Sequence, residues 1–210
     1  MKKLLSIFMV LGLVTMLSGQ GLKFGVGGGL SMFTGPASLT DEYPKGVGYA
    51  SEPMITVKGK FSLPLLPFAL TGTVNYVMLG SEGKGNAMPP LIPIAHTVEI
   101  SSSILMVGVG GEYALIPGPL PIKPYISLDV FLSSFGKSTY KYAYSNGTSG
   151  EFTGDGVTRY GMSIGAGVDL TLLPMFDVNV FAKYNLLNLV GKEDGEDGVS
   201  SISLGAMVIF

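Results

Sequence analysis

The chain has no cysteine and no tryptophan among its 210 residues, and few of its residues are charged. Without thiols it can form no disulfide, no thiolate nucleophile and no cysteine-ligated metal site. Charged residues make up 13% of the chain, against about 25% in soluble globular proteins, which argues against an ordinary cytosolic enzyme. The formal net charge of −2 and the sequence pI near 5.4 argue against a nucleic-acid-binding protein, which carries a concentrated basic surface.

Long apolar runs are also missing, except at the N-terminus. Lys2 and Lys3 precede an apolar run over residues 4–17, which is the pattern of a secretory signal peptide. The run has 14 residues, whereas a membrane-spanning helix needs about 20, so a permanent anchor is the less favoured alternative. We expect cleavage after Gly19, with residues 1–19 as the signal peptide and residues 20–210 as one mature domain of formal net charge −4.

Apolar residues and glycine are abundant. Hydrophobic residues make up 47% of the chain, 31 residues are glycine, and the mean hydropathy is +0.46. An exported chain this apolar without a second long apolar run has another way to cross a membrane, because a closed β-barrel also satisfies every backbone polar group in lipid. A soluble secreted β-sandwich is the competing interpretation.

Period-2 alternation predicts strands through most of residues 20–210. In the last segment, the even-numbered residues from Ile202 to Phe210 form one apolar face, while the other face begins with Ser201 and Ser203. A sandwich would turn the more polar face to water, and a barrel would turn it to the lumen. We expect eight strands, at residues 22–33, 54–63, 68–79, 98–115, 124–135, 157–172, 177–187 and 199–210.

The connections between these strands alternate in length. The short ones are residues 64–67, 116–123 and 173–176, and the long ones are residues 34–53, 80–97, 136–156 and 188–198. Each short connection contains proline, which donates no ladder hydrogen bond and therefore ends strands. An even strand count with short periplasmic turns and long external loops is typical of outer-membrane barrels. The sequence thus predicts an all-β membrane protein, an eight-stranded antiparallel up-and-down transmembrane barrel with both mature ends at the periplasmic side.

Four parts of the mature chain carry a family resemblance: the segments GVGGEY (108–113), KPYI (123–126) and AKYNL (182–186), and the terminal Phe210. With them the chain resembles the small eight-stranded outer-membrane barrels related to OmpA, OmpX and OmpW. The resemblance implies the outer membrane of a Gram-negative bacterium, contact with outer-membrane lipid, and recognition of Phe210 by the barrel-assembly machinery. It includes no periplasmic peptidoglycan-binding domain, so the anchoring function of full-length OmpA is not expected.

Alternation also places charges of both signs in the lumen. The expected ion-pair network consists of Lys23, Lys58, Lys60, Lys183, Glu112, Asp129 and Asp169. An eight-stranded barrel is just wide enough for side chains to fill it, and buried charges need partners, so one interpretation is a plugged interior. The other is a narrow or gated path, whose apolar section would be formed by inward-facing Met54, Met106, Phe131, Phe181 and Met207.

Few residues suggest catalysis or metal binding. His96, the one histidine, lies near Glu99 and Ser101–Ser103, which could act as base, orienting acid and nucleophile in a hydrolase. However, alternation separates Glu99, Ser101 and Ser103 from Ser102, so we expect an exposed loop histidine instead. The acidic segment 192–198 could bind Ca²⁺, but a solvated hairpin tip is favoured.

The remaining loop segments leave further alternatives open. Asn146-Gly147-Thr148 matches a glycosylation sequon, and we favour a turn there. Residues 88–94 form an apolar stretch in an expected loop, suited to a binding surface or to lipid contact. Tyr140, Tyr142, Tyr144 and Phe152 would suit either sugar or partner contacts or an aromatic girdle at the membrane interface.

Three functional hypotheses follow. The leading one is a non-enzymatic outer-membrane barrel with a structural or solute-interacting role. The alternatives are a conduit or binding protein for small hydrophobic molecules, as in OmpW, and a surface adhesin or receptor acting through its external loops. None requires a cofactor, a metal or a nucleic acid.

Overall fold

In the computed structural model, which describes residues 21–63, 66–87, 94–116, 121–173 and 176–210, the chain is almost entirely β-structure. A four-residue helix, α2 (Ala37–Thr40), follows the first strand. The strands are β1 (Leu22–Gly35), β2 (Ser51–Ser62), β3 (Phe68–Ala87), β4 (Ile94–Ala114), β5 (Ile122–Phe135), β6 (Thr139–Tyr144), β7 (Ser149–Thr153), β8 (Val157–Leu173), β9 (Phe176–Val190) and β10 (Ser200–Ile209). The expected signal peptide, residues 1–19, lies outside the described residues.

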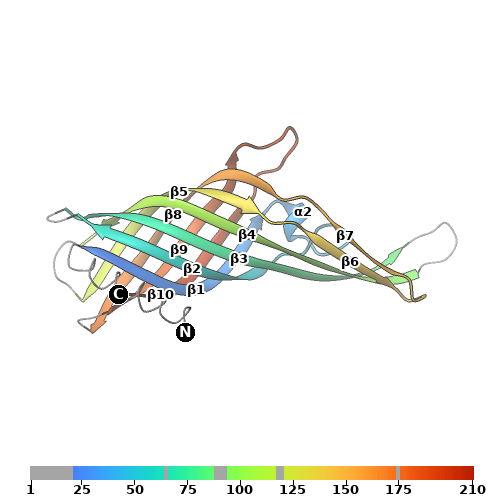
Figure 1. The fold of residues 1–210 in the computed structure, drawn as a ribbon, viewed down its shortest axis with the longest axis horizontal. Coiled ribbons are helices and arrows are strands. Elements are labelled where there is room, and N and C mark those ends of the chain that lie inside the picture. The colour runs from blue at the N-terminus through green and yellow to red at the C-terminus, as the bar shows by residue number, and fades with distance from the viewer. Residues whose placement is uncertain (1–20, 64–65, 88–93, 117–120, 174–175) are drawn as a thin grey trace, which may run out of the picture.

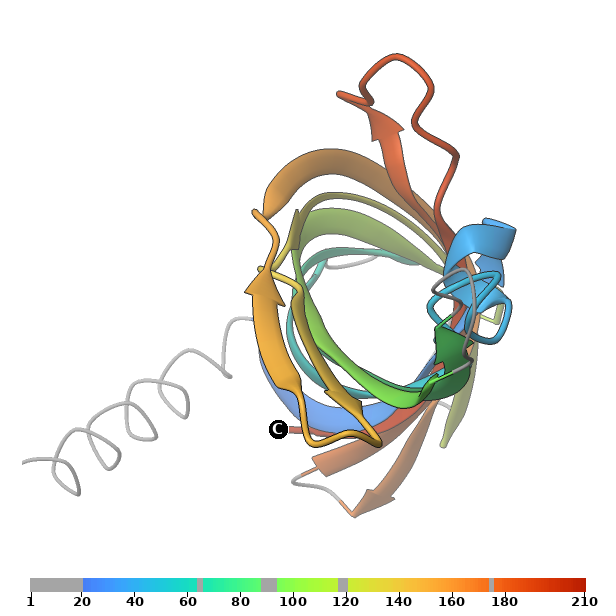
Figure 2. The same cartoon turned by 90° about the vertical axis from the view of Figure 1, so that its right-hand side faces the viewer.

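Eight of these strands close into an antiparallel barrel (Figure 1 and Figure 2). Their order is β3-β2-β1-β10-β9-β8-β5-β4, and pairing of β3 with β4 completes the ring. The first and last strands meet with Val26 opposite Val208, and Phe24 and Phe210 exchange both backbone hydrogen bonds. The predicted eight-stranded barrel is therefore confirmed, and the sandwich alternative is wrong.

The prediction of loops at residues 80–97 and 136–156 is wrong for much of their length, because both segments contain strands. β3 and β4 pair without interruption from Phe68 opposite Tyr113 to Ala87 opposite Ile94. Beyond the barrel, β6 pairs with β4 and β7 pairs with β6. These segments form a four-stranded sheet that reaches to the right in Figure 1 and that we call the extension. Its outer positions, such as Glu82 and Lys84, are exposed and polar; because both faces can meet water there, the apolar alternation fades although backbone pairing continues.

An apolar belt surrounds the barrel. Outward-facing side chains on every barrel strand are apolar and exposed, among them Val26, Val57, Val74, Val109, Val130, Ile164, Val180 and Leu204. On β8 the belt runs from Tyr160 to Leu170, which at about 3.3 Å per residue and a tilt near 40° corresponds to a height of about 25 Å. That height matches the apolar band of outer-membrane barrels.

Exposed aromatic residues mark the two edges of the belt. Phe61, Phe68, Tyr113 and Phe210 lie near the short connections, which we call the turn end of the barrel, and Tyr76, Tyr160 and Tyr184 lie toward the longer connections, the loop end. Aromatic girdles at both interfaces are typical of these barrels. Tyr140, Tyr142, Tyr144 and Phe152 do not belong to them, because these residues lie in β6 and β7 of the extension.

Inside the barrel, large side chains lie across glycines of the neighbouring strand. A Cβ atom on Gly167 would come within 2.4 Å of the Tyr125 hydroxyl, and one on Gly205 within 2.5 Å of the Phe181 ring. Each glycine is directly opposite the residue that covers it. The inward glycines thus create the space that large lumen side chains occupy.

The connection between β1 and β2 packs against the inner side of the loop end. Tyr49 is buried in one hydrophobic cluster with Phe33, Leu79 and Ile100, and Leu39 packs against it. No helix in the described part of the chain is long and apolar enough to cross a membrane.

Candidate functional site

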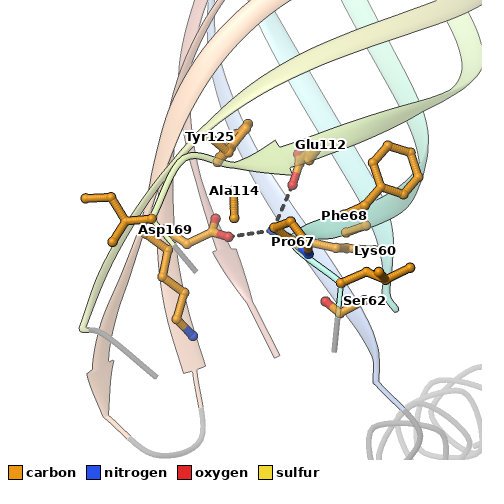
Figure 3. Close-up of a pocket in the computed structure, with 12 residues that line it drawn as sticks. Lys60, Ser62, Pro67, Phe68, Glu112, Ala114, Tyr125 and Asp169 are labelled. Carbon is orange, nitrogen blue, oxygen red and sulfur yellow. Dashed lines mark hydrogen bonds and ion pairs between the residues drawn. The ribbon is translucent and has the colours of Figure 1, made fainter. Parts of the chain in front are cut away.

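Six of the seven charged residues expected in the lumen lie together inside the barrel. The Lys58 ammonium contacts the Glu112 carboxylate, and Lys60 Nζ lies 2.7 Å from Glu112 Oε2 and 2.5 Å from Asp169 Oδ2 (Figure 3). Lys183 Nζ lies 2.7 Å from Asp129 Oδ2. Three lysines thus face three carboxylates, so the network is neutral, and its members come from β2, β4, β5, β8 and β9.

Neutral side chains add hydrogen bonds to the carboxylates. Asp129 accepts from Ser163 Oγ at 3.0 Å and from Thr71 Oγ1 at 3.4 Å. Asn179 Nδ2 donates to Asp169 Oδ1 at 2.7 Å and to the Tyr125 hydroxyl at 2.8 Å. The ammonium groups of Lys58 and Lys60 lie 5.2 and 5.3 Å from the centre of the Tyr125 ring, within cation–π range. Every charged member of the network therefore contacts an opposite charge, and this arrangement fixes the side chains in place.

Lys23 does not join this network. Its ammonium lies 2.5 Å from Asp177 Oδ2 near the turn end, and its side chain is 41% exposed. Asp177 also accepts a hydrogen bond from Thr171 Oγ1. Asp177, Asn179 and Tyr125 are not among the polar lumen residues that we expected from the sequence, although alternation from Lys183 places the first two on the inner face of β9.

Buried apolar side chains adjoin the charges. Some, such as Phe131, lie on the loop-end side of the charged residue of their own strand, whereas Phe181 lies on the turn-end side of Lys183. Met54, Met106, Phe131, Phe181 and Met207 are all buried in one cluster that extends to Phe33 and Leu187. A void lined by both Met54 and Lys183, where charged and apolar side chains meet, measures about 10 Å³, room for about one water molecule. The opening in the ribbon of Figure 2 is therefore filled by side chains at this level.

At the turn end the charged network is the floor of an open vestibule. The vestibule has a volume of about 400 Å³ and is lined by Lys60, Glu112, Asp169 and Tyr125, with Phe68 and Pro67 on its wall (Figure 3). Water can therefore reach the network from this side.

A second ion pair holds the connection between β9 and β10. Arg159 is 9% exposed and donates from Nε and Nη2 to both carboxylate oxygens of Glu196, the shortest contact being 2.7 Å. This hydrogen-bonded guanidinium lowers the pKa of the Glu196 carboxyl to about 2. Asn188 Nδ2 also donates to Glu196. The expectation of a merely solvated acidic tip is thus wrong for Glu196, and Arg159 is a residue that the sequence analysis did not single out.

His96 lies in β4 and is not the exposed loop residue that we expected. Its Nε2 is 2.7 Å from the Tyr43 hydroxyl, and its ring stacks at an angle against Tyr43 and Tyr144. Glu99 and Ser101 are exposed on the other face of the strand, and Ser102 Oγ donates to the Gly136 carbonyl. The separation of Ser102 from Glu99 and Ser101 is therefore confirmed, and the histidine serves to dock the β1–β2 connection onto the extension.

The remaining sequence features fall in the connections. Gly147 has a φ of +88° and its N–H donates to the Tyr144 carbonyl, so the expected turn at Asn146-Gly147 is confirmed. In the apolar stretch 88–94, residues 88–93 lie outside the described residues. The described part of the chain contains no group of three or more histidine, aspartate or glutamate side chains that could hold a metal ion.

No protein-family model and no curated protein sequence matches the chain. Among solved structures, a major outer membrane protein from Thermus thermophilus matches with a TM-score of 0.54 and 12% identity, over 90% of this chain and 99% of that one. Neisserial surface protein A matches with a TM-score of 0.46 and 15% identity, over 90% and 96% of the two chains. Ail of Yersinia pestis matches with a TM-score of 0.43 and 14% identity, over 90% and 97%. With its apolar belt and its closed ring of eight strands, the chain has the fold of the small outer-membrane β-barrel proteins.

Proposed function

We propose that this protein is a non-enzymatic, non-conducting barrel of the Gram-negative outer membrane. The observation that carries the proposal is the filling of the lumen by the charged network and the adjoining apolar cluster, with a void of about 10 Å³ where they meet. A hydrated ion or a small solute needs far more room than one water molecule occupies. His96 bonds to the Tyr43 hydroxyl, and Ser102 Oγ donates to the Gly136 carbonyl, so these two side chains are not paired as base and nucleophile; this supports a non-hydrolytic role.

Planar-bilayer recordings test this proposal. We expect the reconstituted wild type to give no stable conductance steps. The double variant Phe131→Ala/Phe181→Ala, which removes two rings from the apolar cluster, is the positive control for a barrel that has been opened. Steady conductance of the wild type, or uptake of small solutes into liposomes that contain it, would overturn the proposal in favour of a conduit.

The extension favours a second candidate function, that of a surface receptor. Its four strands stand beyond the belt, and β7 is an edge strand that presents Phe152 with 65% of its surface exposed. Replacing residues 139–153 by a short turn is expected to leave the barrel folded, because β6 pairs with β4 beyond the ring and β7 pairs with β6 alone. Loss of attachment by cells that carry this shortened protein, compared with cells that carry wild type at equal surface density, would support the receptor function; equal attachment would contradict it.

We also propose that Phe210 is part of the assembly signal. Its ring is exposed on the outer face at the turn end, and its backbone pairs with Phe24 at the seam between the first and last strands. Phe210→Ala is expected to slow membrane insertion in cells. Spontaneous folding into detergent micelles should be unchanged, because there the assembly machinery has no part.

A further inference from the structure

A hollow opens on the outer side of the barrel, in the half of the belt nearer the loop end. It has a volume of about 470 Å³, and its lining includes Val109, Val130, Leu132, Tyr160, Met162 and Val190. These residues come from β4, β5, β8 and β9, and Val109, Val130, Tyr160 and Val190 are each more than half exposed. The hollow is therefore on the lipid side of the wall and not in the lumen.

An irregularity in the pairing of β8 with β9 creates the hollow. Tyr160 is opposite Val190, but the next paired residue, Met162, is opposite Leu186. The three residues 187–189 thus face Gly161 alone. Leu187 and Asn188 turn inward and are buried, whereas Leu189 and Val190 are exposed.

The extra residues let the end of β9 leave the barrel wall. The connection that follows leans outward from the barrel, as the red loop in Figure 1 and Figure 2 shows. Asn188 holds it there, donating to the Asp197 carbonyl at 2.8 Å and accepting from the Val199 N–H at 2.6 Å. Leu189 and Val190 consequently form one side of the hollow, opposite the outer face of β5.

The position and chemistry of the hollow define its occupant. Among the residues that line the hollow, Tyr160 alone carries a hydroxyl or other strong hydrogen-bonding group in its side chain, so water in the hollow would find few partners. An empty hollow would forfeit dispersion contacts along its whole lining. Inside the belt the surrounding medium is hydrocarbon. We propose that the hollow holds an acyl chain of one lipid from the membrane leaflet at the loop end.

A second copy of the chain fits the hollow less well. A two-fold contact brings the same patch of both subunits together, so two concave surfaces would face each other and both would stay empty. A solute passing to the lumen is also disfavoured, because the Phe131 ring covers Gly161 so closely that a Cβ atom there would lie 2.3 Å from it. The hollow therefore ends at the wall.

Native mass spectrometry after transfer from phosphatidylcholine vesicles into a mild detergent tests the proposal. We expect one phosphatidylcholine to remain on each wild-type barrel. Val130→Trp fills the hollow and should reduce the retained fraction at least tenfold. The matched control is Val57→Trp, on β2 across the barrel and similarly exposed to lipid, which should retain the lipid as wild type does. Foldedness of each variant is checked by the heat-dependent shift in gel mobility.

Several outcomes would overturn the inference: no lipid retained by wild type, equal retention by Val130→Trp, equal loss in Val57→Trp, or a wild-type mass equal to that of a dimer. If Val130→Trp does not fold, Val109→Phe fills the hollow from the directly opposite position on β4 and is expected to give the same loss. Retention by a folded Val109→Phe variant would equally overturn the inference. None of these results depends on whether the lumen conducts.

Discussion

At the scale of single residues, the lumen shows why each buried charge needs a partner of opposite sign. Asp129 is 2% exposed and contacts Lys183, Ser163 and Thr71. Taking away one partner of a buried pair leaves an uncompensated charge, which costs about 3–5 kcal/mol. We therefore expect Asp129→Ala to lower the free energy of unfolding by about that amount, measured by urea titration of the barrel in lipid vesicles.

Two further variants separate the charge effect from the loss of a side chain. Asp194→Ala, at an exposed position in the β9–β10 connection, is expected to change the stability by less than about 0.5 kcal/mol. The double variant Asp129→Ala/Lys183→Met should recover part of the loss, because it removes the unpaired cation. Equal stabilities of Asp129→Ala and Asp194→Ala would mean that water screens the network.

The bond between Arg159 and Glu196 gives the β9–β10 connection a defined pH dependence. The Glu196 pKa falls from 4.5 to about 2 because the carboxylate accepts hydrogen bonds from the guanidinium. A carboxyl whose pKa is lowered in the folded state adds stability that is present above its ordinary pKa and is lost as the pH falls through the folded value. We expect a spin label at Asp194→Cys to keep the same mobility from pH 7 to about pH 4 and to become more mobile toward pH 2.

The absence of native cysteine makes this label unique. In the Arg159→Gln background, the label should already be mobile at pH 7. A label that is equally restricted at pH 2 and at pH 7 in the wild-type background would show that Asn188 alone holds the connection.

At the scale of elements, the register of a strand decides which side chains meet lipid. Val168 lies opposite Val180 and next to inward-facing Asp169, so an arginine there must enter the apolar belt. We expect Val168→Arg to cost about 2–4 kcal/mol in unfolding free energy if the position is near the bilayer midplane. Ser101→Arg, outward-facing but in the extension, should cost less than about 1 kcal/mol. The reverse order would mean that the faces of β8 are exchanged by a one-residue shift.

A second feature at the scale of strands is that a glycine on one strand lies directly opposite an inward-facing aromatic residue on the next. A methyl group on Gly167 would meet the Tyr125 hydroxyl, the ring carbon that bears it and the Val180 carbonyl, all within 2.7 Å. Overpacking of this kind typically costs about 1–3 kcal/mol, so we expect Gly167→Ala to lower the unfolding free energy by that amount. Gly80→Ala is the matched control, because nothing lies within 4 Å of the place that its Cβ atom would take. Similar stabilities of the two variants would show that the barrel widens to accept the methyl group.

The sequence predicted the strands that cross the belt because lipid on one side and a packed lumen on the other impose period-2 alternation. The prediction of strands from the sequence failed beyond the belt, where lipid no longer lies on one side of the strand. Residues 80–87 pair as regular strand, yet Gly80, Glu82 and Lys84 on the outer face are exposed and carry no apolar pattern. Within the lumen, alternation selected Lys58 and Glu112 correctly but could not identify the partner of Lys23, since pairing across a barrel depends on strand tilt and stagger. The Arg159–Glu196 pair joins residues from different elements, and alternation within one strand carries no information about it.

At the scale of the whole molecule, the barrel and the extension have different roles. The barrel supplies a lipid-facing belt around a filled lumen, and the extension continues two of its strands beyond the belt, because β3 and β4 pair over their full length. The extension therefore stands on the same side of the membrane as the loop end of the barrel. Whether the extension can meet other cells then depends on which end of the barrel faces outward.

The orientation can be measured with single cysteines, because the chain has none of its own. Short turns face the periplasm in outer-membrane barrels and long loops face the exterior, so Thr148→Cys in the β6–β7 turn and Asp194→Cys should react with a membrane-impermeant maleimide on intact cells. Pro121→Cys, exposed beside β5 at the turn end, should react only after the outer membrane is permeabilised. Equal reactivity of all three sites in permeabilised cells is the control for accessibility. Labelling of Pro121→Cys alone on intact cells would reverse the orientation, place the extension in the periplasm, and rule out the receptor function while leaving the closed lumen untouched.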